Sequence, residues 1–130
     1  MKKLLMLAAI VCSVVLSPVA HAEWTKVTAD KDGNTFYVDL ERIKKHDGKV
    51  YFWQLYDYLK PYQGMLSFTA YTEVECGPLR YKDLTWTSYK GPMASGKISS
   101  TAWAPDKYWK YPNPNSINEV ILNVVCNHKP

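Results

Sequence analysis

The sequence predicts an α+β domain in which a single antiparallel sheet of about six strands carries one C-terminal helix on a face, with one disulfide. Met65–Cys76 alternates between apolar and polar residues, which is typical of a half-buried antiparallel strand. Ser116–Asn127 has the spacing of an amphipathic helix. The strand ends on Cys76 and the helix contains Cys126, so a disulfide between them would hold the helix on the sheet.

The first 22 residues have the features of a signal peptide for export. Lys2 and Lys3 precede an apolar run from Leu4 to Leu16, and the segment ends in a small-x-small pattern at Ala22. The run is about 13 residues long, whereas a membrane-spanning helix needs about 20. We therefore expect cleavage after Ala22 and a mature domain of residues 23–130. Cys12 lacks the small preceding residue of a lipid-acceptor cysteine and is expected to leave with the signal.

Composition excludes several classes of partner for the mature chain. Its 108 residues are enough for one domain, with 14 basic against 12 acidic residues. This balance is too weak to favour nucleic acid or membrane binding. No other apolar run approaches the length of a membrane span, so we expect no stable membrane insertion. The expected location is the periplasm, the cell surface or the exterior.

Only two cysteines remain after cleavage, and exported proteins usually pair an even number of cysteines. A bridge between Cys76 and Cys126 closes a loop of about 50 residues, for which chain entropy gives roughly 4 kcal/mol. A two-cysteine metal site is the alternative, but no histidines lie nearby at ligand spacing. We expect no metal.

The N-terminal part is predicted to start with a hairpin. Trp24–Asp30 and Thr35–Asp39 are β-prone and flank a turn cluster. Asp39 is well placed to cap a single helical turn at Leu40–Ile43, and the next turn is His46–Gly48.

Three longer strands follow and form most of the sheet. Lys49–Tyr58 carries aromatics on both faces, which predicts that both faces are partly covered. Leu59–Gly64 is predicted to turn the chain back into Met65–Cys76, and Leu79–Tyr89 is the next β-prone run. Lys97–Thr101 is a short last strand.

The C-terminal part is predicted to be a crossover loop and then a helix. Ala102–Pro114 is rich in Trp, Tyr and Pro, so we expect a surface loop held by aromatic anchors. Asn115 or Ser116 caps the helix. Its expected apolar stripe is Ile117, Val120, Ile121, Val124 and Val125. Cys126 lies off this stripe, so it must reach its partner from the last turn.

Catalytic patterns are not found in the mature chain. His46 falls in a turn and His128 in the C-terminal tail, and their spacing to Lys44 or Lys129 supports no ribonuclease-like site. Glu73 and Glu75 project from one strand face, as a solvated pair usually does. The chain has no nucleophile-elbow, P-loop or zinc-protease motif. We therefore expect no enzyme, and no residue pattern signals a haem ligand set.

The 18 aromatic residues all fall in the mature chain, where most are expected in the core and in cross-strand ladders. Exposed Tyr and Trp also suit a protein-binding surface, because they give contact area at low entropic cost. The candidate residues for such a surface are Tyr71, Trp86, Tyr89, Trp103 and Trp109.

Taken in order, several segments resemble the surface-adhesin protein E family across nearly the whole mature chain. They are Thr35–Asp39 with Arg42 and Ile43, Val50–Tyr58 with Trp53, the serine-containing strand to Cys76, the Gly91–Gly96 loop, and Pro114–Ser116 through Val125 and Cys126. The resemblance implies a six-stranded antiparallel sheet with a disulfide-tethered C-terminal helix, and a homodimer is compatible with it. It also implies binding of host matrix or serum proteins such as vitronectin, laminin and plasminogen, and it makes haem the cofactor to consider.

The chain departs from that family at two places. It lacks a lipid-acceptor cysteine, and only Lys60 represents the basic segment of the family's adhesin. The leading expectation is therefore an exported, non-enzymatic binding domain without a lipid anchor. The alternatives are a structural or accessory subunit of an envelope complex and, ranked last, a small periplasmic enzyme.

Overall fold

The computed structural model describes residues 22–129, so the predicted signal peptide falls almost wholly outside the described residues. Its elements begin with β1 (Thr25–Ala29), β2 (Thr35–Val38), the 3₁₀ turn η1 (Leu40–Arg42) and β3 (Lys44–His46). They continue with β4 (Lys49–Tyr62), β5 (Met65–Glu75), β6 (Arg80–Tyr89), β7 (Ile98–Ala102) and α1 (Ile117–Asn127).

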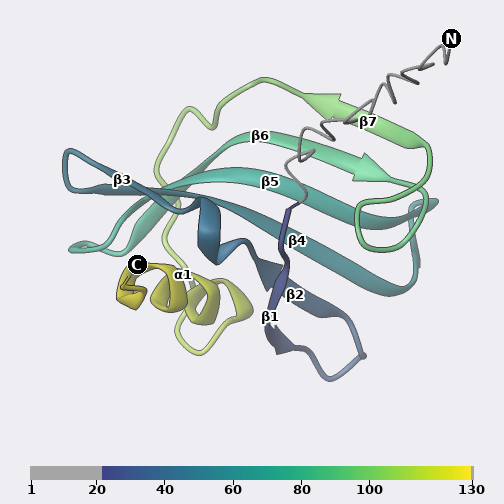
Figure 1. The fold of residues 1–130 in the computed structure, drawn as a ribbon, viewed down its shortest axis with the longest axis horizontal. Helices are drawn as coiled ribbons and strands as arrows, with labels where there is room; N and C mark the ends of the chain where they lie inside the picture. The colour runs from purple at the N-terminus through teal and green to yellow at the C-terminus, as the bar shows by residue number, and fades with distance from the viewer. Residues whose placement is uncertain (1–21, 130) are drawn as a thin grey trace, which may run out of the picture.

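All the strands belong to one antiparallel sheet. The order across it is β1-β2-β4-β5-β6-β7, and β3 pairs with β4 beside this path. In Figure 1, β7 lies at one edge of the sheet and α1 lies beside the opposite end, near β1 and β2. The predicted fold class is confirmed. Sequence analysis missed β3, because its residues Lys44, Lys45 and His46 are all exposed and show no apolar alternation.

The β4–β5 hairpin is longer than predicted. The predicted turn over Leu59–Gly64 is wrong, because β4 continues to Tyr62 and only Gln63 and Gly64 form the turn. Both turn residues have positive φ, 48° and 81°, as a tight two-residue hairpin turn requires. Pro61 is tolerated because the β4–β5 register is interrupted between Asp57 and Tyr62.

A β-bulge in β6 changes which side chains share a face of the sheet. Thr85 pairs with Tyr71 and Asp83 pairs with Thr72, so Leu84 is an extra residue on β6. Before the bulge, Asp83 therefore lies on the same face as Thr72. After it, Trp86 lies on that same face, opposite Ala70.

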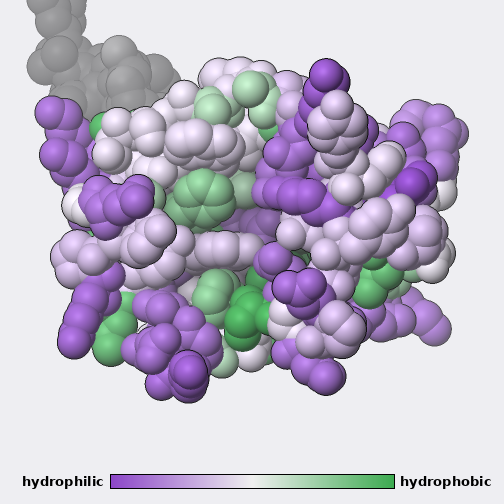
Figure 2. Space-filling model, turned by 180° about the vertical axis from the view of Figure 1, so that it is seen from behind, coloured by the Kyte–Doolittle hydropathy of each residue, from purple (hydrophilic) through white to green (hydrophobic). Residues whose placement is uncertain are grey.

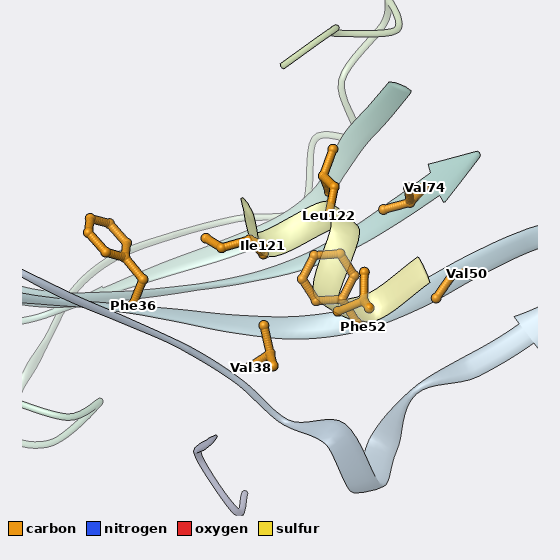
Figure 3. Close-up of a cluster of buried hydrophobic side chains, with 8 residues drawn as sticks. Phe36, Val38, Val50, Phe52, Val74, Ile121 and Leu122 are labelled. Carbon is orange, nitrogen blue, oxygen red and sulfur yellow. The ribbon is translucent and has the colours of Figure 1, made fainter. Parts of the chain in front are cut away.

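The hydrophobic core lies between α1 and one face of the sheet, which we call the helix face. Phe52 and Val74 are fully buried there, together with Val38 of β2. Figure 3 shows these side chains directed toward Ile121 and Leu122 of the helix. Burial of an aliphatic or aromatic side chain contributes about 1.5–3 kcal/mol. This cluster is therefore the main source of stability.

The C-terminal helix begins and ends as its sequence specifies. The Ser116 side chain caps it by accepting a hydrogen bond from the Glu119 N–H, and Cys126 in its last turn is bonded to Cys76. The predicted disulfide is confirmed. The predicted apolar stripe is partly wrong, because Val120 is 39% exposed whereas Leu122 is 2% exposed. The buried stripe is thus rotated toward Leu122 and brings the last turn to the end of β5.

The other face of the sheet, which we call the open face, is partly covered by the loop after β6. The Ser67 hydroxyl donates to the Gly91 carbonyl at 2.6 Å and accepts from the Ala94 N–H at 2.9 Å. The Asp57 carboxylate accepts from the Met93 N–H at 2.8 Å. Leu55 and Ser67 are accordingly buried. This agrees with the prediction that both faces of β4 are partly covered.

The disulfide gives the first testable prediction. The Cys76→Ser, Cys126→Ser double variant should lose up to about 4 kcal/mol of unfolding free energy, because its unfolded chain regains the entropy of the 50-residue loop. Urea unfolding of both proteins, with and without reductant, measures this loss. Reductant should lower the midpoint of the wild type and leave that of the double variant unchanged. Equal midpoints for the two oxidised proteins would contradict the prediction.

Candidate functional site

A groove lies on the helix face where α1 does not cover the sheet. Its volume is about 580 Å³, within the usual range for ligand sites. Gln54, Phe68 and Trp86 of the three long strands line it. Tyr62 at the end of the β4–β5 hairpin and Asn118 of α1 also belong to its lining. The groove therefore joins the sheet, its longest hairpin and the helix.

Stacked aromatic side chains connect the groove to the core. The rings of Phe36 and Tyr56 meet edge to face with centroids 4.9 Å apart, and Tyr56 meets Phe68 at 5.7 Å. Phe68 stacks on Trp86 with centroids 5.9 Å apart and an interplanar angle of 29°. The row thus crosses β2, β4, β5 and β6. Because Phe36 is fixed in the core, the row gives Trp86 a packed support.

A hydrogen-bonded bridge closes the groove on the side of α1. The Tyr56 hydroxyl donates to Asn118 Oδ1 at 2.9 Å, and Asn118 Nδ2 donates to the Tyr81 hydroxyl at 3.0 Å. Burial, with a smaller contribution from Asp83, raises the pKa of Tyr56 far above its ordinary value. Burial also raises the pKa of Tyr81. Both hydroxyls therefore stay protonated at neutral pH, and the Tyr56 hydroxyl keeps the hydrogen that it donates to Asn118.

A strap formed by residues 103–111 covers the edge of the first half of β6. Tyr81 and Lys110 exchange two backbone hydrogen bonds of 2.9 Å each. The Asp106 N–H donates to the Asp83 carbonyl at 2.9 Å, and the Asp83 N–H donates back to Asp106 Oδ2 at 2.8 Å. The strap therefore pairs with β6 almost as another strand would.

Three charged side chains fasten the strap beside the groove. Lys110 Nζ lies 2.9 Å from Asp83 Oδ2 and 2.8 Å from Asp106 Oδ2. Burial opposes the charge of Lys110, but the two carboxylates raise its pKa well above the ordinary value. A further chain of 2.8 Å hydrogen bonds runs from Gln54 through Thr72 to Asp83. The polar end of the groove is thus held in one arrangement.

The aromatic anchors predicted for this loop are mostly absent among the described residues. Trp103, Tyr108 and Tyr111 are exposed, at 80%, 72% and 62%. Trp109 alone of these aromatics is packed, with the Arg80 guanidinium 4.5 Å and the Lys82 ammonium 4.7 Å from its ring centroid. Backbone hydrogen bonds to β6 and the ion pairs of Lys110, rather than aromatic contacts, therefore hold most of the strap.

The five candidate binding residues do not form one surface. Trp86 lines the groove, whereas Tyr71 lies on the open face, 4.9 Å from Trp53 between ring centroids. Tyr89 lines a separate hollow with Trp24 and Trp53 on the open face. Trp109 lies at the far end of that face, and Trp103 is exposed at the start of the strap. The structure thus separates Trp86 from the other four.

Several groove residues were missed by sequence analysis. They are Tyr56, Tyr58, Tyr62, Phe68, Tyr81 and the ionic set Asp83, Asp106 and Lys110. The even-numbered spacing of residues 54, 56 and 58 was a usable signal, because it places them on one face of β4. No sequence pattern predicts that Asp83, Asp106 and Lys110 meet, because their contact depends on how the strap pairs with β6.

The remaining polar candidates lie away from the groove. The exposed His46 side chain, at the end of β3, pairs with Asp47, and the His128 carbonyl accepts from Lys45 after the end of α1. Glu73 and Glu75 each pair with a cation, Lys49 and Arg80, both at 2.9 Å. Within residues 22–129, no three His, Cys, Asp or Glu side chains gather as a metal site would require.

The groove does not fit haem. Haem iron takes axial ligands such as histidine, a thiolate, methionine paired with histidine, or tyrosinate. The described groove lining contains no histidine and no cysteine. The raised pKa values of Tyr56, Tyr58 and Tyr81, caused chiefly by burial, disfavour tyrosinate. We therefore assign no cofactor to this site.

Hydrophobic side chains gather into no broad patch around these features. Figure 2 shows only small, separate hydrophobic patches among polar residues on the side turned away from the viewer in Figure 1. The groove, with its aromatic and polar lining, is therefore a more specific candidate for a binding site than an exposed hydrophobic patch. In the described part of the chain, no helix is long and apolar enough to cross a membrane.

Comparisons with known proteins give a family match and a shared fold. Residues 24–127 match the model of the family described as Surface-adhesin protein E. Crystal form II of Haemophilus influenzae protein E has a TM-score of 0.61 and 14% identity, over 82% of this chain and 88% of that one. Another structure of Haemophilus influenzae protein E has a TM-score of 0.59 and 14% identity, over 82% of this chain and 85% of that one.

The selenomethionine form of the same Haemophilus influenzae protein gives a TM-score of 0.55 and 18% identity, over 78% of this chain and 84% of that one. At these identities the structural likeness shows the fold alone. A search of curated protein sequences gives no match.

The buried tyrosine bridge predicts a pH dependence. Because the pKa of Tyr56 is raised in the folded state, its contribution to stability is complete below the unfolded pKa of about 10 and is lost as pH rises above it. Tyr56→Phe should lower stability at neutral pH by about 1 kcal/mol, since the bond to Asn118 is lost. It should also lose less stability between neutral and alkaline pH than the wild type.

Urea unfolding at neutral pH and near pH 11 checks this difference. Tyr108→Phe is the matched control, because this exposed tyrosine loses the same hydroxyl outside the groove. Equal alkaline losses for the wild type and Tyr56→Phe would rule the prediction out.

Proposed function

Because the chain belongs to the surface-adhesin protein E family, we propose that it is an exported, non-enzymatic domain that binds another protein through the groove on its helix face. The observation that supports this choice most is the support given to Trp86. Its ring stacks on Phe68 at the end of a row that starts in the core. A rigid aromatic side chain in a hollow is the usual centre of a protein-binding site.

The polar end of the groove adds specificity to this aromatic floor. Asp83, Asp106 and Lys110 hold one another, and Asn118 is held by two tyrosine hydroxyls. These groups lose little conformational freedom when a partner binds, which favours affinity. A pre-organised site of this kind requires no nucleophile, base or metal.

We take host extracellular-matrix or serum proteins as the partners to test, because the family resemblance points to them. The alternative partner is another protein of the bacterial envelope. The chain would then be an accessory subunit that uses the same groove. The two alternatives differ in the partner that is recovered and not in the residues that bind it.

The test compares two alanine variants, one of Trp86 on the helix face and one of Tyr71 on the open face. Trp86→Ala should weaken binding to immobilised vitronectin, laminin or plasminogen at least about 30-fold, the effect of a central aromatic contact. Tyr71→Ala on the open face is the control and should change binding less than about threefold. Surface plasmon resonance measures both, with unfolding midpoints taken to confirm that each variant is folded.

Three outcomes would count against the proposal. Larger loss with Tyr71→Ala than with Trp86→Ala would place the binding surface on the open face. Wild-type protein that binds none of the three host proteins but co-purifies with an envelope protein would replace the host partner by an envelope partner. Absence of any specific protein partner in both experiments would overturn protein binding itself.

A further inference from the structure

The edge strand β7 differs from the other exposed borders of the sheet. In the described part of the chain it pairs only with β6, and its residues 98–101 are all exposed. It contains no charged residue and no proline. Such an edge offers free backbone N–H and C=O groups to another extended chain.

The other borders carry the protections that β7 lacks. The short strand β3 has Lys44, Lys45 and His46, and charged side chains discourage pairing at an edge. The edge strand β1 carries Lys26 and lies against α1. The first half of β6 is covered by the strap through the Tyr81–Lys110 bridge. Only the second half of this border, where β7 lies, is left both uncharged and uncovered within residues 22–129.

The surroundings of β7 are positively charged and apolar. Lys90 and Lys97 are both exposed, and the Lys90 N–H donates a hydrogen bond to the Lys97 carbonyl just before β7 begins. The acidic side chains of β6 and the strap, Asp83 and Asp106, are engaged by Lys110. The Asp57 carboxylate, which faces the loop between the two lysines, accepts a hydrogen bond from the Met93 N–H. Ile98 is 53% exposed at the start of β7, and Trp103 is 80% exposed just after its end.

From these features we propose that β7 binds an extended segment of a partner protein as an added strand, with acidic residues of that segment beside Lys90 and Lys97. Backbone hydrogen bonds along residues 98–102 supply the affinity, and the two lysines select the charge of the flank. Ile98 and Trp103 contact apolar side chains of the segment. This inference rests on the proposed protein-binding function.

The position of β7 also connects the added strand with the groove. Ser100 of β7 lines the groove together with Ser88 and Trp86 of β6. Every second side chain of an added strand projects on the same face as Ser100. Those side chains lie at the mouth of the groove, so one segment contacts both the edge and the groove.

The test uses amide hydrogen exchange with defined synthetic peptides. The probe is an octapeptide that alternates threonine and valine between two terminal glutamates. We expect exchange of those amides of residues 98–102 that point away from β6 to slow roughly tenfold or more at saturating peptide. The same peptide with an N-methyl group on every backbone nitrogen has no N–H donor on either edge, so it cannot form the ladder and should give no protection. A peptide with terminal lysines should bind more weakly.

A charge reversal on the protein tests the role of the lysine. Lys97→Glu should remove the preference, because Lys90 remains beside the new carboxylate, so that the glutamate-flanked and lysine-flanked peptides protect β7 about equally. Lys129→Glu, at the far end of the chain, is the matched control and should keep the wild-type preference. Lys97 is exposed, so both variants are expected to fold.

The opposing results are also defined. Unchanged exchange at β7 with saturating peptide, or equal protection by the N-methylated peptide, would overturn the added strand. Protection that grows with protein concentration without peptide would assign the edge to a second copy of the chain instead. Failure of the proposed function is distinguishable, because it appears as no binding to immobilised proteins. Failure of this inference appears as a bound protein that leaves exchange at β7 unchanged.

Discussion

The packing of α1 on only part of the helix face determines how the rest of that face is used. Ile121, Leu122 and Val125 cover Phe52 and Val74, and the disulfide at Cys126 fixes the last turn of the helix at the end of β5. The helix is 11 residues long and cannot reach across the whole sheet. The surface left uncovered on β4, β5 and β6 is the floor of the groove.

Tyr56 connects this core with the groove. Its ring packs between Phe36 and Phe68, and its hydroxyl holds Asn118 near the start of the helix. A shift of α1 would therefore disturb the groove wall as well as the core. This arrangement explains why a small domain with a disulfide can present a rigid aromatic site. The stability that fixes the helix is also what keeps the site in one conformation.

Sequence alone predicted the parts of the fold that follow local periodicity. The alternation in Met65–Cys76 and the helical spacing after Ser116 each reflect one face in contact with one core, and both were found in the structure. The full length of the β4–β5 hairpin was not predicted, because Gln63 adopts a positive φ, which is uncommon for glutamine. The candidate site was predicted least well, since Trp86 alone of the five chosen aromatics reaches the groove.

The bulge at Leu84 explains in physical terms why Trp86 and Trp109 lie on different faces. In a regular strand Trp86 would share a face with Arg80 and Lys82, and so with Trp109 on the open face. The extra residue reverses the alternation, so that Trp86 joins Tyr81 and Asp83 on the helix face. Asp83 lies before the bulge, where β6 pairs with the strap and where Lys110 and Asp106 contact it. One inserted residue thus brings the aromatic end of the groove onto the same face as its ionic end, and no periodic pattern in the sequence shows this residue.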